Sequence, residues 1–248
     1  MSTIKRIDRD RLYTDTLYRF QYVCDFADFG AEDIAYIKGA APLVAPLVPT
    51  IVDAVYVKLF GFDITKATFL NRNEGFKGAM ETSIEDLNVN SDVIKFRKDF
   101  LSKYLVKLVT AEYDANFVKY LDWVGRIHTD TPGKKSRINV EYIHINALFA
   151  WLHGFLAQTL DSLPELQSDS KKRAGTIAAF SKLLWIQNDL FARYYVKDGV
   201  DVRDSGAVAR KGVEGWCRRN SEGVAAGLAV AAIAVGVLGW KNGRFGGF

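Results

Sequence analysis

The sequence of 248 residues has few cysteines and few prolines. Its two cysteines, Cys24 and Cys217, are too far apart to suggest a disulfide framework, and reduced thiols in a cytosol-facing protein are the simpler interpretation. Only five prolines occur, which favours long helices over a loop-rich fold. The first ten residues alternate in charge and lack an apolar core, so we expect no secretory signal.

The main part of the chain has no excess charge of either sign. Of 33 basic and 29 acidic residues, seven basic and three acidic ones lie from Arg203 onward, which leaves 26 of each before it. A nucleic-acid-binding domain needs a concentrated basic face, so the composition argues against nucleic acid as a partner. The basic excess of the tail suits a position near an anionic membrane surface.

Apolar residues recur at steps of three and four along most of the chain, and no strand-like alternation competes with them. The pattern predicts an all-α fold. We expect Pro42, Pro46 and Pro49 at helix starts, Ser91 as a helix cap, and a short helix followed by an irregular loop over 65–90. The main helices are expected at 9–26, 50–60, 92–108, 117–127, 140–160 and 174–195.

The C-terminal part has a different composition. A polar, basic linker over 200–222 precedes an uncharged apolar run at 223–240, and a short basic tail follows at 241–248. The run would span about 27 Å as a helix, enough for a hydrocarbon core, and basic residues flank it. We expect a tail-anchored protein with its folded domain in the cytosol. The alternative is a loosely ordered or partner-binding tail, because alanine and glycine insert weakly into membranes.

One of the three histidines is unusually placed. It shares a helical face with apolar residues eleven, seven and four positions earlier: His128 with Phe117, Leu121 and Val124. A buried imidazole needs a partner for its nitrogens, so it is either a core histidine bonded to a backbone carbonyl or a metal or haem ligand. Zinc is a poor alternative, because His144 and His153 are nine residues apart and have no further histidine or cysteine at the spacing of a zinc site.

The segment around this histidine resembles the end of the F helix in globin-coupled sensors and protoglobins, where a glycine and a branched apolar residue shortly precede the proximal histidine. The resemblance covers about 9–195. It rests on 123–128 (WVGRIH), 19–24 (RFQYVC), 53–56 (DAVY), the 97–108 helix and 183–190 (LLWIQNDL). It implies that residues 1–199 form a globin-like domain with an extra N-terminal helix and no distinct D helix.

The resemblance also implies a cofactor, haem b, with His128 as the proximal iron ligand. Tyr56 falls where the family often has a distal tyrosine that donates a hydrogen bond to a bound gas, although a core aromatic is the alternative. Phe100 would face the iron, and Phe96 occupies the place of the distal histidine of storage globins. Val55 and Val124 complete the expected pocket.

Two features depart from the family. Val55 stands where archaeal protoglobins have tryptophan, and a long basic loop over 134–137 follows His128. Both bear on how a gas reaches the site and on how far haem would be buried.

The implied function is reversible binding of a diatomic gas (O2, NO or CO) by a membrane-tethered sensor or gas-binding protein. One alternative is a haem enzyme, such as an NO dioxygenase or nitrite reductase, although the sequence offers no reductase domain. The other is a haem-free helical adaptor. By analogy with family sensors, 140–160 and 174–195 are candidate surfaces for a homodimer.

Overall fold

Aspartate side chains begin several of the helices. In the computed structural model, which describes residues 4–131 and 138–196, Asp8 caps α1 (Arg9–Thr14) and Asp15 caps α2 (Thr16–Phe26) by accepting hydrogen bonds from backbone N–H groups of the first turn. The prediction of one helix over 9–26 is therefore wrong at Asp15. Its extended backbone (φ −119°, ψ 102°) ends the first helix and starts the second.

Prolines mark the next three elements: α3 (Ala31–Val44), the 3-10 turn η1 (Ala45–Leu47) and α4 (Val48–Phe60). Pro46 and Pro49 lie in the first turn of η1 and α4, as expected. Pro42 instead lies inside α3. Pro42 is two residues from the end of that helix, so the backbone hydrogen bond that it cannot donate disturbs only the last turn.

The short helix α5 (Asp63–Ala67) and the turn η2 (Thr68–Leu70) precede a loop over 71–91 and the long helix α6 (Asp92–Thr110). The expected short helix and irregular loop are thus confirmed. Ser91 stands at the start of α6, but its side chain makes no capping bond to that helix. Its hydroxyl instead accepts a hydrogen bond from the Asn88 N–H at 3.0 Å, so it stabilises the loop.

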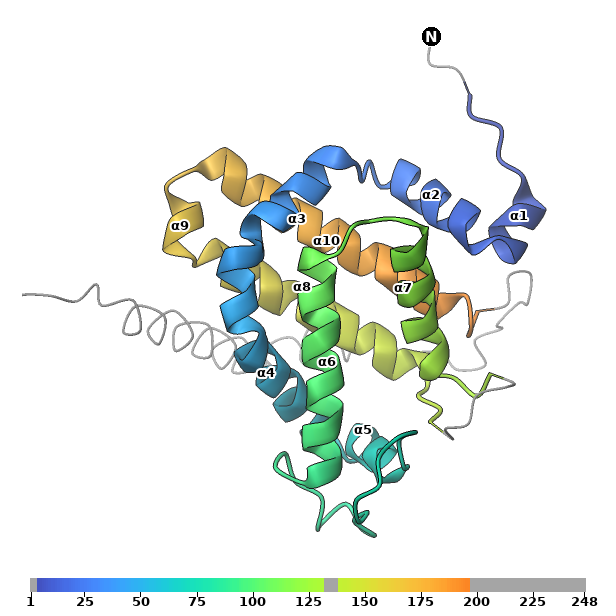
Figure 1. Ribbon diagram of the computed structural model, residues 1–248, viewed down its shortest axis with the longest axis vertical. Helices are drawn as coiled ribbons and strands as arrows, with labels where there is room; N and C mark the ends of the chain where they lie inside the picture. The colour runs from blue at the N-terminus through green and yellow to red at the C-terminus, as the bar shows by residue number, and fades with distance from the viewer. Residues whose placement is uncertain (1–3, 132–137, 197–248) are drawn as a thin grey trace, which may run out of the picture.

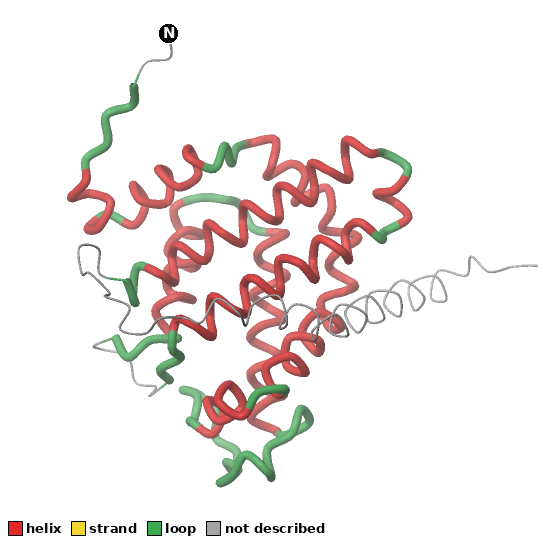
Figure 2. The backbone as a smooth tube through the Cα atoms, turned by 180° about the vertical axis from the view of Figure 1, so that it is seen from behind, coloured by secondary structure: helices red, strands yellow, loops and turns green. Residues whose placement is uncertain are grey.

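The last helix lies at the centre of the fold (Figure 1). Helix α10 (Ser170–Ala192) packs against α3, α7 (Ala115–Ile127), α8 (Tyr142–Asp161) and the short α9 (Pro164–Gln167), whereas α6 packs against α3 and α4. Every described element is helical (Figure 2). The all-α prediction is confirmed for the part of the chain that the structure describes.

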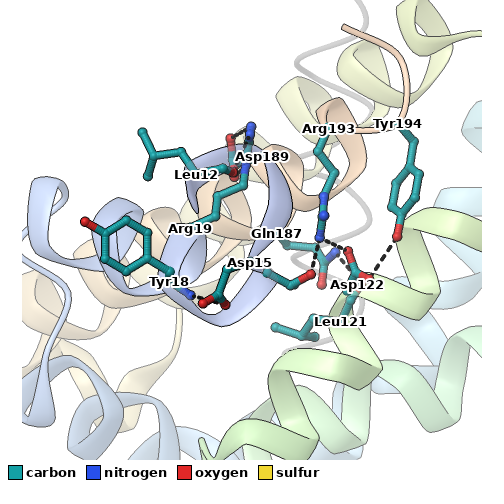
Figure 3. Close-up of polar contacts among 11 residues, drawn as sticks. Leu12, Asp15, Tyr18, Arg19, Leu121, Asp122, Gln187, Asp189, Arg193 and Tyr194 are labelled. Carbon is teal, nitrogen blue, oxygen red and sulfur yellow. Dashed lines mark hydrogen bonds and ion pairs between the residues drawn. The ribbon is translucent and has the colours of Figure 1, made fainter. Parts of the chain in front are cut away.

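Ion pairs join α2 and α7 to the C-terminal end of α10 (Figure 3). Arg19 of α2 makes two bonds of 2.7 Å to the carboxylate of Asp189. Arg193 and the Tyr194 hydroxyl both donate to Asp122 of α7 at 2.8 Å. These groups are largely buried, and a two-pronged arginine–carboxylate pair fixes geometry as well as charge. The end of α10 therefore holds both neighbouring helices in place.

One described stretch, 31–60, is apolar and long enough to cross a membrane. It consists of α3, η1 and α4, and Ile37, Ile51 and Val52 from it are buried in the core, as expected of core helices. The linker, apolar run and tail predicted over 200–222, 223–240 and 241–248 lie outside the described residues. The anchor and its membrane location stay predictions from the sequence.

Candidate functional site

Helix α7 positions the histidine that the sequence singled out. Asp114 begins the helix by accepting hydrogen bonds from the backbone N–H groups of its first turn. Phe117, Leu121 and Val124 form its buried face. His128 follows that face at the C-cap of the helix and is half-buried. The predicted alignment of His128 with the apolar face is therefore present.

Gly125, three residues before His128, lets α7 approach α10 closely. A Cβ atom at this position would stand 2.8 Å from the backbone oxygen of Leu190 and 3.3 Å from the Cα of Phe191. Real side chains do not tolerate the shorter distance, so the glycine is needed for this spacing. It places the end of α7, and with it His128, directly against the last turn of α10.

A hydrogen bond to a backbone carbonyl, which the core-histidine alternative also predicted, selects the tautomer of the neutral imidazole. Nδ1 of His128 lies 2.7 Å from the carbonyl oxygen of Val124, one turn earlier. Because a carbonyl can only accept, Nδ1 carries the proton in the neutral ring and Nε2 carries the lone pair. The ring also packs against Phe191, with centroids 5.2 Å apart. Both contacts hold the ring in one orientation.

The backbone of His128 is held as well. Its carbonyl oxygen accepts one hydrogen bond from the Val140 N–H (2.9 Å) and another from the Tyr195 hydroxyl (3.2 Å). Tyr195 packs against Tyr142 at the start of α8, with the two rings tilted and their centroids 5.3 Å apart. Residues that precede α8 and follow α10 thus fix the position at which α7 ends.

Two apolar clusters adjoin this region. The histidine-side cluster consists of Val124, Ile145 and Phe191 with half-buried neighbours that include Tyr104 and Phe149. The tyrosine-side cluster has Val55, Tyr56, Phe69 and Ile94 among its buried members, with half-buried neighbours that include Leu101, Leu105, Leu148 and Trp151. Helices α6 and α8 contribute to both clusters. The two clusters are therefore neighbours along the same pair of helices.

Tyr56 and Val55 lie buried on α4, and Tyr56 packs against Phe69 with ring centroids 5.6 Å apart. Burial raises the pKa of the Tyr56 phenol above its usual value, and the positive charge of Arg97 opposes this effect. The hydroxyl therefore keeps its proton at neutral pH and remains a hydrogen-bond donor. This is the chemical state that a distal donor requires.

The two predicted distal phenylalanines form a separate aromatic group on α6. Phe96 contacts Phe100 edge-on, with centroids 5.0 Å apart, and Phe76 of the preceding loop at 5.4 Å. Phe100 is 47% exposed. Within the described residues, no ring contact joins this group to Tyr56. The structure thus places Tyr56 and the two phenylalanines on neighbouring helices without bringing their rings together.

The residues present suit a haem group. A haem needs apolar walls for its macrocycle and a neutral imidazole nitrogen for its iron, and both lie along α6, α8 and the end of α7. No group of three or more His, Cys, Asp or Glu side chains that could hold a metal ion occurs in the described part of the chain. The donor set is a single oriented histidine among apolar side chains.

The fold is that of a helical protein of the globin class, and His128 is the candidate iron-binding histidine. The protoglobin family model matches residues 16–201, three quarters of the chain. The chain belongs to the protoglobin family. Its fold is similar to the globin domain of the Geobacter sulfurreducens globin-coupled sensor, with a TM-score of 0.54 and 22% identity over 71% of this chain and 97% of that one. Comparison with curated proteins gave no match.

Four residues of this region make contacts that the sequence did not predict: Phe69, Arg97, Gly125 and Tyr195. Gly125 belongs to the WVGRIH segment, and its position inside a helix was a usable signal of close packing, because glycine weakens a helix unless close packing requires it. The other three act through partners distant in sequence, which periodicity does not reveal.

Proposed function

We propose that this chain binds haem b against the apolar side chains of α6 and α8, that Nε2 of His128 would hold the iron, and that the protein reversibly binds a diatomic gas (O2, NO or CO). The observation that carries the proposal is the 2.7 Å contact between His128 Nδ1 and the Val124 carbonyl. It selects the tautomer in which Nε2 has the lone pair that an iron ligand needs.

The residues around His128 would set its strength as a ligand. A hydrogen bond from Nδ1 to a carbonyl raises the basicity of the ring and fixes its orientation. Tyr195 and Val140 fix the backbone at the same residue, and Phe191 covers the ring. These contacts reduce the freedom that His128 would lose on binding, which favours retention of the cofactor.

On the face of the bound haem opposite His128, Tyr56 would supply a protonated hydroxyl in an apolar environment, and Val55 would help to exclude water. The haem iron, when bound, supplies the coordination position for the gas. In a dry environment a single donor is worth more than in water, so Tyr56 would favour a ligand that accepts a hydrogen bond. We propose a role in gas binding and sensing rather than catalysis, and likeness to the globin domain of a globin-coupled sensor supports it.

The absorption spectrum of the purified, haem-reconstituted protein tests the proposal. We expect a Soret band that shifts when CO is added to the reduced protein, and its loss or strong change in His128→Ala. His144→Ala and His153→Ala are matched controls, because these side chains contact Glu141 and Ser181 instead. A wild-type protein that takes up no haem would contradict the proposal and favour a haem-free helical adaptor.

A further inference from the structure

Arg97 of α6 has an unusual environment for an arginine. Its guanidinium lies over the ring of Phe69, 4.9 Å from the centroid, and Nη2 donates to the carbonyl oxygen of Asn71. Its Nε atom is buried and has no hydrogen-bond partner among the described residues. A buried donor left without a partner is costly, so this atom has the capacity to donate to a further acceptor.

The charge of Arg97 is also uncompensated. Burial lowers its pKa to about 10, which still leaves it protonated at neutral pH. The other two largely buried arginines, Arg19 and Arg193, each pair with an aspartate at 2.7–2.8 Å. The structure gives Arg97 no such carboxylate within the described ranges. Buried cations are normally paired, so a negatively charged partner is the chemistry that this position lacks.

The unpaired cation lies beside the distal tyrosine. Arg97 and Tyr56 both contact the ring of Phe69, the guanidinium at 4.9 Å and the Tyr56 ring at 5.6 Å from its centroid. Burial raises the pKa of the Tyr56 phenol, and the charge of Arg97 opposes this with a smaller effect. A second cation, Lys98, stands 5.7 Å from the centre of the Tyr56 ring, but it is paired with Asp53 at 2.8 Å. Arg97 is thus the cation near Tyr56 that has capacity for a further ligand.

We propose that Arg97, together with the Tyr56 hydroxyl, forms a subsite for a small anionic ligand on the distal side. The inference rests on the proposed function. The ligands are small monovalent anions that coordinate ferric haem, such as azide or nitrite. Dioxygen would be favoured for the same reason, because it draws electron density from the metal that holds it. CO stays nearly neutral, so Arg97 should have little effect on its affinity.

Azide titration of the ferric haem protein, followed by absorption, tests the subsite. Arg97→Met removes the charge and keeps the length of the side chain, and Arg97→Lys restores a charge. We expect Arg97→Met to raise the azide Kd about ten- to hundredfold, the effect of one lost charge-assisted hydrogen bond, and Arg97→Lys to recover part of it. Lys98→Met, the matched control, should change the Kd by about twofold or less, because Asp53 already pairs with the charge of Lys98 at 2.8 Å.

Two further readouts separate this subsite from other roles of Arg97. The CO affinity of the reduced protein should stay within about twofold in Arg97→Met. The haem-free variant should melt at the same or a higher temperature than wild type, because an uncompensated buried charge is removed.

An unchanged azide Kd in Arg97→Met, with a normal Soret band and CO affinity, overturns the subsite and leaves the proposed function standing. Faster haem loss with unchanged azide affinity also overturns it, because Arg97 would then contact a haem propionate. A wild-type protein without a Soret band overturns both proposals together.

Discussion

The substitution Gly125→Ala tests whether close contact between α7 and α10 positions the end of α7. The added Cβ would lie 2.8 Å from the Leu190 backbone oxygen, against about 3.4 Å for an ordinary contact, so the helices must separate by about 0.6 Å. Overpacking of this kind costs about 1–3 kcal/mol. The higher helix propensity of alanine offsets about 1 kcal/mol of that cost.

Gly154→Ala in α8 is the matched control, because no atom lies within 4 Å of the Cβ it would add. It gains the same propensity without a clash, so the difference between the two variants isolates the packing cost. We expect urea unfolding to show Gly154→Ala more stable than Gly125→Ala by about 1–3 kcal/mol, and melting temperatures to separate by about 2–4 °C per kcal/mol. Equal stability of the two variants would refute the close approach.

Two more predictions concern the end of α10. Tyr195→Phe removes the 3.2 Å bond to the His128 carbonyl, and that carbonyl keeps its hydrogen bond from Val140, so the free energy of unfolding should fall by only about 0.5–1 kcal/mol. Haem transfer to an acceptor protein should become faster in this variant. An unchanged transfer rate would contradict this role of Tyr195. Burial, aided by Asp122, raises the pKa of Tyr194 to about 12. As the pH rises, the Tyr194 phenol therefore loses its proton in the unfolded chain before it does so in the folded protein. The stability that the protonated phenol provides below pH 10 should be lost between about pH 10 and 12. Urea unfolding across this range should show a shallower loss in Tyr194→Phe; a slope equal to that of wild type would count against the bond.

Helical periodicity predicted the elements that bury one continuous face. Helix α6, expected over 92–108, spans Asp92–Thr110, and His128 continues the buried face of α7. Local chemistry was less informative at the ends. Asp15 is tolerated within a helix but also caps one, and here its side chain accepts from the Tyr18 N–H and divides the predicted helix. The Ser91 hydroxyl has an alternative donor in Asn88, which the sequence does not reveal.

The missed site residues depend on contacts across the fold. Arg97 stands among Lys95, Lys98 and Asp99, a pattern typical of a solvated helix face, yet Asn71 and Phe69 of the preceding segment bury it. Tyr195 reaches a carbonyl 67 residues earlier. Periodicity assigns a residue to a face of its own helix, but the neighbour of that face is set by how the helices pack together.

Resonance Raman and absorption spectra of His128→Gly, recorded with and without added imidazole, test the central claim most directly. If Nε2 of His128 is the axial ligand, the reduced variant should lose the iron–histidine stretching band and the wild-type Soret band. Imidazole should restore both by entering the space left by the side chain. Wild-type spectra in His128→Gly without imidazole would contradict the account, because another residue would then hold the iron.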